Sequence, residues 1–510
     1  MVFPILGANT AAPGDLVQNS LRISPVDDGF LARSTSGVSD SNTRTFTLSM
    51  WVKKTVNVEQ HLYGFRVDSD NMSYLRFNSD NRLRFAAEAT GGAVYRVETN
   101  AQFRDPSAWY HVVVAVDTTQ GTAGNRVKLY VNGTQHTSLN ATDYPAQNFD
   151  VAINQEEDMI VGAMRNSNGT TTGQVDGYIS ETHFVDGAAS APTVFAETDS
   201  NGFWIPKDCK DDITYGTRGF HLQYKQVGTG TASASTIGAD TSGNGNHFTS
   251  NNLVAVDITT DNPMNNFSTG NPLILIAGGN ITPSFSEGMV KWTAGSNGSY
   301  GSSGHGNMAV TNGKWYWEMK IDSGRNNGVT CGIAPVSVFE SNYGTSTSTD
   351  YTFARDNLGS FGYQHTNSGS KKVTGTAAEN ADDYGSPGWS VDDIIGVAMD
   401  LDNLKLYFSK NGTWQTSGDP TSGSTGTGAA FTLTSPTSEV SLLAFSTGYY
   451  LPCCAFASNS AGAVMSFNFG NGFFGTTAIS SEGTNASGIG KFEYDVPSGY
   501  TALSTKGLNE

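Results

Sequence analysis

The sequence contains few charged residues and few cysteines, and it has no long apolar run. Only 15% of its 510 residues are charged, which is below the usual share in globular proteins. Four cysteines are too few for a disulfide scaffold in a chain of this length, and no Cys-x-x-Cys pair points to zinc or redox chemistry. No window approaches the run of about 18 apolar residues that a membrane helix needs. We expect free, partly buried thiols at Cys209, Cys331, Cys453 and Cys454.

Basic clusters and a basic leader are also missing. The net charge is −18, and no run of Lys or Arg exceeds the pairs at 53–54 and 371–372, so we expect no nucleic-acid partner. The first residues are weakly apolar, but they carry no basic stretch, and Pro4 and Gly7 interrupt them. The N-terminus is therefore not a convincing signal peptide, and we expect no membrane insertion.

Glycine and aromatic residues are plentiful. The chain has 59 Gly, and Ser, Thr and Asn are abundant as well; all four favour turns, caps or strands over long helices. Intrinsic disorder is the rival interpretation of a polar, glycine-rich chain, but 27 Phe, 20 Tyr and 8 Trp argue against it. The composition therefore predicts an all-β protein with many short strands, and the length predicts more than one domain.

Apolar patterns predict at least seven strands in the first part of the chain. Residues 109–117 are apolar on both faces, which is typical of a strand at the centre of a sandwich. Asn132 and Gly133 predict a hairpin turn, because both residue types tolerate a positive φ. We expect strands at 45–52, 74–77, 82–85, 109–117, 127–131, 159–163 and 178–185.

A second set of strands follows further along the chain. Two stretches of small and polar residues, 226–252 and 295–308, look like connections. Another Asn-Gly pair, Asn411 with Gly412, predicts a second hairpin turn. We expect strands at 314–321, 329–334, 360–363, 394–401, 404–409, 440–445 and 464–469.

Ordered segments of both halves resemble known domain families. The first half is similar to a LamG, concanavalin A-like jelly roll through SMWVKK (49–54), WYHVVVAVD (109–117), KLYVNGT (128–134) and DGYISETHFVDG (176–187). The second half resembles a SPRY domain through GKWYWEMKI (313–321), WSVDDIIGV (389–397) and LKLYFSKNG (404–412). Both families are two-sheet sandwiches. The resemblance implies an all-β chain with two concanavalin A-like β-sandwich (jelly-roll) domains in tandem, LamG-like and then SPRY-like.

Five further segments resemble tail-fibre and structural proteins of marine bacteriophages. They are ILGAN (5–9), DTSGNGN (240–246), DNPMNNF (261–267), FNFGNGFF (467–474) and VPSGYTALST (496–505). This resemblance implies a virion surface component that is made in the host cytoplasm. It implies a homo-oligomer, a host surface glycan or receptor as partner, and other virion proteins bound through the N-terminal peptide.

The predicted organisation has five parts. They are an N-terminal attachment peptide (1–18), a LamG-like sandwich (19–205), a connecting region (206–294), a SPRY-like sandwich (295–476) and a C-terminal tail (477–510). A tail fibre or tail-associated adhesin is the first functional interpretation. A capsid decoration or connector protein that binds only other virion proteins is the alternative.

The sequence offers no catalytic residues, and we expect no enzyme. The densest carboxylate run, 155–158, is more simply a solvated loop than half of a hydrolase pair. No G-x-S-x-G elbow, H-E-x-x-H motif or phosphate-binding loop occurs. A polysaccharide-degrading enzyme is therefore the least favoured alternative.

One loop has the oxygen-rich spacing of a calcium site. Asp240, Asn244 and Asn246 alternate with glycines in a tight segment, and the LamG resemblance implies Ca²⁺ bound at a rim by carboxylates and carbonyls. The alternative is an ordinary turn in which Asp and Asn side chains bond to their own backbone. Both interpretations stay open at this point.

Three aromatic residues are candidates for ligand contact. Trp414 follows the second Asn-Gly turn, and Tyr449 and Tyr450 lie near a predicted strand end. Exposed aromatic rings with amides and carboxylates nearby are what sugar recognition usually needs. Trp315, Trp317 and Trp389 are better interpreted as core residues.

Overall fold

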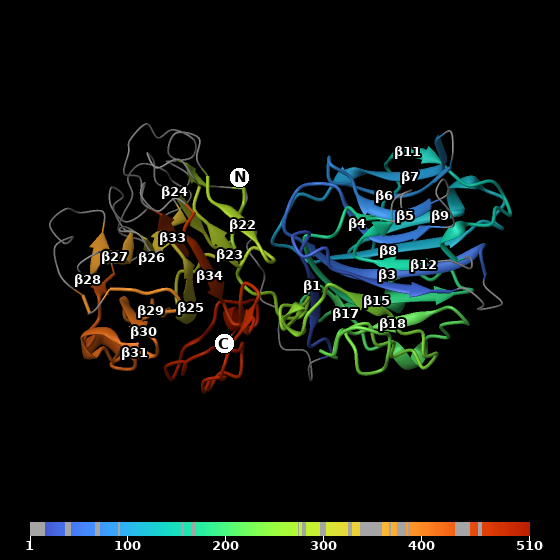
Figure 1. Cartoon of the computed structure of the whole chain (residues 1–510). Coiled ribbons are helices and arrows are strands. Elements are labelled where there is room, and N and C mark those ends of the chain that lie inside the picture. The colour runs from blue at the N-terminus through green and yellow to red at the C-terminus, as the bar shows by residue number, and fades with distance from the viewer. Residues whose placement is uncertain are drawn as a thin grey trace. The chain divides into compact units, whose positions relative to one another are not determined.

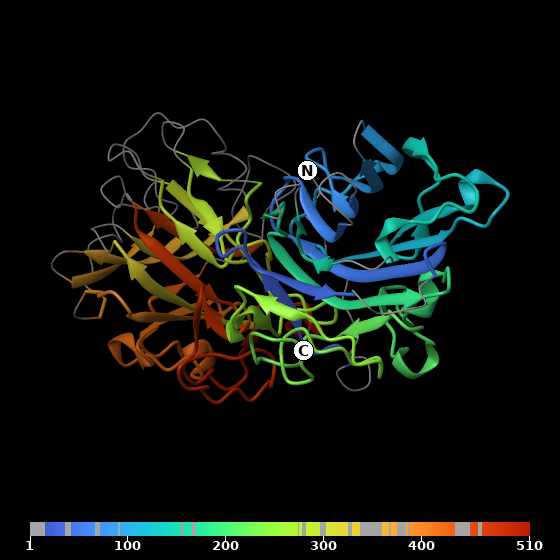
Figure 2. The same ribbon diagram turned by 45° about the vertical axis from the view of Figure 1, so that its right-hand side comes forward.

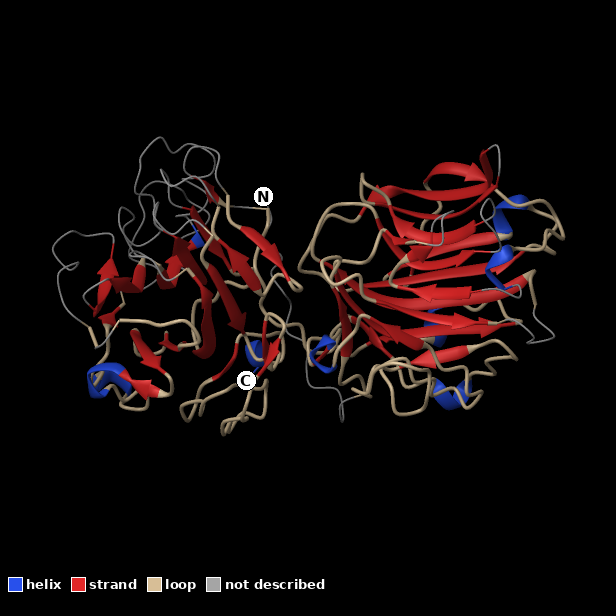
Figure 3. Ribbon diagram, viewed as in Figure 1, coloured by secondary structure: helices blue, strands red, loops and turns tan. Residues whose placement is uncertain are grey.

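The computed structural model describes most of the chain, and strands dominate it (Figures 1 and 3). Among the described residues, no helix is long and apolar enough to cross a membrane. The described residues are 16–35, 42–66, 72–89, 92–154, 158–165, 170–273, 275–277, 282–295, 302–324, 329–336, 360–366, 369–374, 384–385, 388–433, 449–456 and 462–509. Short 3₁₀ turns occur at η1 (Ala123–Asn125), η2 (Ala152–Asn154), η3 (Pro192–Val194), η4 (Lys210–Asp212), η5 (Ala255–Asp257), η7 (Gln415–Ser417), η8 (Gly423–Thr425) and η9 (Gly507–Asn509).

Contacts along the chain divide it into two compact units, the first ending at Asn266 and the second beginning at Phe267. Each unit has two large sheets, so the expected pair of β-sandwiches in tandem is confirmed. The segment 206–294, which we expected to connect the domains, is divided between them. Its first part adds strands to both sheets of the first unit, and its last part adds strands to both sheets of the second.

The first unit contains two eight-stranded sheets. One sheet runs in the order β10 (Thr134–Gln135), β9 (Val127–Val131), β8 (Tyr110–Asp117), β3 (Thr45–Lys54), β15 (Gly177–Asp186), β1 (Ser20–Ile23) and β20 (Ile258–Thr259), with β18 (Phe220–Leu222) also on β15. The other runs in the order β11 (Leu139–Asp143), β7 (Gly92–Gln102), β6 (Arg82–Ala89), β5 (Met72–Phe77), β4 (Gln60–Arg66), β12 (Asp158–Val161), β2 (Phe30–Ser34) and β19 (Thr249–Asn251). Short pairs complete the unit: β13 (Met164–Arg165) with β14 (Thr171–Thr172), and β16 (Ala196–Thr198) with β17 (Trp204–Pro206).

The core of the first unit lies between these two sheets (Figure 2). Alternate residues of β3, such as Leu48 and Met50, meet Leu75 and Phe85 of the facing sheet in one buried cluster. The turn after β9 has φ values of 48° at Asn132 and 77° at Gly133, so the predicted hairpin is confirmed.

The outer face of the first sheet is also covered, which explains why every residue of β15 is buried. Val113 and Val185 point away from the main core and pack with Phe195, Cys209 and Tyr215 in a second apolar cluster. These three residues come from the segment after β15. The strand 109–117 is accordingly buried on both faces, as predicted.

The second unit has a six-stranded and a nine-stranded sheet. The first runs in the order β21 (Ile276–Ala277), β24 (Ser302–His305), β33 (Tyr450–Phe456), β26 (Thr330–Pro335), β27 (Phe361–Thr366) and β28 (Gly369–Thr374). The second runs in the order β22 (Ser284–Ser286), β23 (Lys291–Thr293), β34 (Val464–Asn468), β25 (Lys314–Ser323), β29 (Ile394–Asp400), β30 (Lys405–Lys410) and β31 (Thr413–Trp414). Further strands are β32 (Phe431–Thr432) on β30, β37 (Thr501–Ala502) on β25, and the pair β35 (Phe473–Phe474) with β36 (Thr477–Ala478).

Most predicted strands occur where they were expected, and the core positions of Trp315, Trp317 and Trp389 are confirmed. The predicted strand at 440–445 and residues 1–15 of the N-terminal peptide lie outside the described residues, as do three of the four residues of the acidic run 155–158.

Candidate functional site

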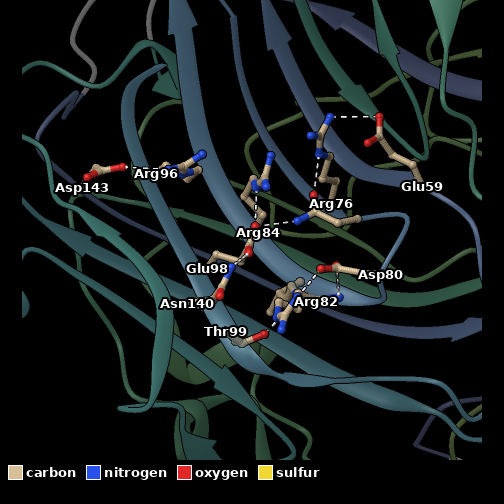
Figure 4. A network of polar contacts seen from close by, with 12 residues as sticks. Glu59, Arg76, Asp80, Arg82, Arg84, Arg96, Glu98, Thr99, Asn140 and Asp143 are labelled. Carbon is tan, nitrogen blue, oxygen red and sulfur yellow. Dashed lines mark hydrogen bonds and ion pairs between the residues drawn. The ribbon is translucent and has the colours of Figure 1, made fainter. Parts of the chain in front are cut away.

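A network of charged and amide side chains covers the outer face of β5, β6, β7 and β11 (Figure 4). Successive residues of a strand point to opposite faces, so the sequence Arg-Leu-Arg-Phe of β6 buries its apolar residues and turns Arg82 and Arg84 outward. Arg84 lies opposite Arg76 of β5 and opposite Glu98 of β7. Strand register thus sets three polar residues in a row across three strands.

Glu98 is the centre of this network. Its Oε2 accepts hydrogen bonds from Arg84 Nε and Asn78 Nδ2, and its Oε1 accepts one from Asn140 Nδ2, each at 2.5 Å. Arg76 extends the network: its Nη1 lies 2.9 Å from Glu59 Oε1, and its guanidinium stacks over the ring of Tyr74. The central carboxylate is therefore held by three donors, of which Arg84 and Asn140 lie on strands and Asn78 directly follows β5.

The edge of the network is open to solvent. Arg96 and Asp143 form an ion pair of 3.3 Å with side chains 42% and 62% exposed, and Arg82 pairs with Asp80. Positive and negative groups alternate, so the face presents both hydrogen-bond donors and acceptors. Such a surface can bind a ligand with several hydroxyl groups, because each hydroxyl both donates and accepts.

The predicted contact residue Trp414 lies at the other candidate surface, in the second domain. Its partly exposed ring contacts the rings of Tyr316 and Tyr407 edge to face, at centroid distances of 6.4 Å and 6.5 Å. The preceding turn brings Tyr494 beside it: a Cβ added to Gly412 would lie 2.6 Å from Tyr494 Cδ1. Tyr494 comes from the expected C-terminal tail, and nothing in its local sequence indicated this position.

The other two predicted contact residues differ in environment. Tyr449 is 43% exposed, which suits a surface contact. Tyr450 is 3% exposed and packs against Phe361 inside β33, so its ring belongs to the core. Tyr449 precedes β33, whereas Tyr450 is the first residue of this strand, and every residue of the strand is buried.

In the predicted calcium loop, the Asp and Asn side chains hydrogen-bond to backbone groups of the protein, as in the ordinary turn that was the alternative interpretation. Asp240 Oδ1 accepts the backbone N–H groups of His221 and Ser242, and Oδ2 accepts Ser242 Oγ and the N–H of Asn246. Asn244 and Asn246 donate their amides to backbone carbonyls of residues 216–219. Each carboxylate oxygen thus already has two donors, and calcium binding at this loop stays a prediction.

A third polar cluster is buried under the segment after β15. Glu181, His183 and His221 each offer a ligand atom, and these atoms lie within 4.8 Å of one another. Burial raises the pKa of Glu181 to about 7, against the lowering effect of His183. Burial also lowers the pKa of His183 well below its usual value and that of His221 to about 3. Sequence analysis missed this cluster, although Glu181 and His183 have the spacing of one strand face.

The fold and these surfaces define a class: two lectin-like β-sandwich domains that present polar and aromatic groups on rigid strands. Residues 28–195 match the concanavalin A-like lectin/glucanases superfamily, and residues 314–471 match the SPRY domain. The chain therefore carries a concanavalin A-like domain followed by a SPRY domain, which confirms both domain resemblances. The virion origin implied by the flanking segments stays a prediction.

Similar solved structures share little sequence with this chain. The SPRY domain of human HERC1 is 18% identical, with 35% of this chain and 86% of that chain covered and a TM-score of 0.24. The native heptameric SAP-like pentraxin from Limulus polyphemus is 13% identical, with 34% and 76% covered and a TM-score of 0.26. No curated protein matches the chain.

Proposed function

We propose that this protein is a non-catalytic adhesin of a virus particle, a tail fibre or tail-associated component, whose first domain binds a host cell-surface glycan. The polar network around Glu98 is the observation that supports glycan binding. Arg84, Glu98 and Asn140 hold one another in place on three adjacent strands, and sites built on strands are more precise than sites on loops. A glycan would contact the exposed edge of this network without having to order it first.

The virion placement depends on the segments that resemble phage structural proteins, among them 240–246 and 261–267. Several copies on one particle multiply a weak affinity for each glycan. Mass spectrometry of purified particles of the encoding virus should find this chain. Its absence from the particles would contradict the virion placement and leave glycan binding open to its own test.

Glycan binding is tested with the purified full-length protein on intact host cells and on cells stripped of surface glycan. We expect saturable binding to intact cells that is lost on stripping. The double variant Arg96→Ala/Asp143→Ala should weaken binding by roughly tenfold, because it removes two side chains that the glycan would contact directly. The matched control is Arg44→Ala/Asp150→Ala, which removes a similarly exposed ion pair elsewhere in the first domain.

Trp414→Ala decides between the two domains. Unchanged binding by this variant agrees with a site on the first domain. Loss of binding with Trp414→Ala but not with Arg96→Ala/Asp143→Ala would move the site to the aromatic surface of the second domain. No binding under any condition by folded, correctly assembled protein would overturn the adhesin proposal in favour of a virion connector.

A further inference from the structure

Two histidines stand opposite each other on paired strands of the first domain. His183 of β15 and His221 of β18 are register partners, and their rings stack at a centroid distance of 3.9 Å with an angle of 17°. Their neighbours Phe184 and Phe220 point into the main core, so both imidazoles lie on the outer face of the sheet. Phe195 and Tyr215 cover that face and keep the histidines out of solvent.

A β-bulge brings a carboxylate to the same place. The pairing of β15 with β3 shifts register between Ser180 and His183, and Glu181 within the bulge has a φ of 45°. Bulges re-aim side chains and are common beside functional sites. Here Glu181 Oε2 lies 2.7 Å from His221 Nε2 and 3.9 Å from His183 Nε2.

The cluster contains buried polar atoms without hydrogen-bond partners. Glu181 Oε1 and His221 Nδ1 have none, although the side chains are only 9% and 2% exposed. An unsatisfied buried polar group costs about 1–3 kcal/mol, and an unseen ion is one of the standard explanations for such a group. His183 differs, because its Nδ1 lies 2.9 Å from Tyr215 Oη. That contact orients the ring with Nε2 toward Glu181, as partners of metal-bound histidines do.

We infer that Glu181, His183 and His221 bind one divalent transition-metal ion of the zinc type. Two imidazole nitrogens and one carboxylate oxygen suit Zn²⁺ and its neighbours, whereas Ca²⁺ prefers an all-oxygen set. Water takes the fourth position of a tetrahedral ion. The ion joins β15 to β18 and stabilises the pairing of these two strands. This inference is independent of the glycan site, which lies on the other sheet.

Metal content tests the inference without any variant. The full-length protein should be purified without chelator from cells grown with added zinc. Inductively coupled plasma mass spectrometry should then find one zinc ion per chain. Removing the ion with a strong chelator should lower the melting temperature of the first domain by several degrees, and zinc should restore it. Cobalt added to the stripped protein should produce the visible absorption of a tetrahedral site. A stripped protein with unchanged melting temperature and no cobalt absorption would overturn the inference.

Single substitutions then assign the ligands. Glu181→Gln, His183→Gln and His221→Gln should each weaken zinc binding by roughly 100-fold or more. Loss of a residue that only hydrogen-bonds a metal ligand already lowers metal affinity about 10–100-fold. His111→Gln is the matched control: His111 is equally buried in the same sheet but hydrogen-bonds Ser49 and Trp204. One zinc per chain in all three variants would overturn the assignment. If His111→Gln also lost zinc, the loss in the other variants would reflect general unfolding, and the assignment of the three ligands would be overturned.

Discussion

Arg84 and Glu98 lie directly opposite each other on β6 and β7, with Arg84 Nε 2.5 Å from Glu98 Oε2. Glu98 is almost completely buried, and its other donors are the neutral amides of Asn78 and Asn140. A buried carboxylate that loses its only cationic partner is left poorly compensated. This pair is therefore both the centre of the polar network and a support of the fold.

Arg84→Ala should lower the free energy of unfolding of the first domain by about 2 kcal/mol, because Glu98 keeps only amide donors. Urea unfolding of the full-length protein measures this loss. Arg44→Ala, which breaks the exposed pair with Asp150, should leave the unfolding midpoint nearly unchanged. Equal destabilisation by the two substitutions would show that the ion pair with Arg84 does not stabilise the buried carboxylate of Glu98.

The second domain should become less stable as the pH rises from about 4.5 to about 7. Burial raises the pKa of Glu318 from its usual 4.5 to about 7, although backbone N–H groups of Glu493 and Tyr494 lower it. Between these values the folded protein holds a proton that the unfolded chain has released, so stability falls with pH across that window by up to about 3 kcal/mol. Thermal unfolding at a series of pH values measures the slope.

Glu318→Gln tests the origin of that slope. The amide does not titrate, so the decline between about pH 4.5 and 7 should disappear. The variant should also be less stable at every pH, since an NH₂ group would face backbone N–H donors that Glu318 now accepts. An unchanged slope in this variant would assign the pH dependence to another group.

Gly412→Ala should destabilise the second domain more than a Gly→Ala substitution at another position with positive φ. Gly412 has a φ of 77°, and an added Cβ would lie 2.6 Å from Tyr494 Cδ1. Gly499→Ala is the control, because Gly499 has a φ of 84° and no atom within 4 Å of an added Cβ. The control should cost about 1 kcal/mol from backbone strain alone, and Gly412→Ala clearly more. Equal melting temperatures for the two variants would show that Tyr494 moves aside freely.

Asp240→Asn should lower the melting temperature of the first domain by the same amount in calcium and in EGTA. The carboxylate of Asp240 accepts four hydrogen bonds from the protein itself, and an amide cannot accept all of them. Thermal unfolding in both solutions measures the effect. A calcium-dependent rise in melting temperature that disappears in Asp240→Asn would establish the calcium site at this loop instead.

The sequence by itself determined the local elements. Period-2 alternation predicted β3 and β25, and the Asn-Gly pairs predicted both hairpin turns, because side-chain direction and positive φ are local properties of the chain. The apolar character of 109–117 on both faces even indicated that β8 lies at the centre of its sheet. The order of the matched segments was enough to indicate both domain families.

Only the tertiary structure decided which distant segments meet. The pairing of β15 with β18 places His221 beside Glu181 and His183, and the chain after residue 477 returns to bring Tyr494 to the turn before Trp414. The loop of Asp240 became a self-bonded turn because its carboxylate meets the backbone of His221. Such contacts depend on which strands pair and on packing between residues far apart in the chain, and a local pattern does not say which distant segments will meet.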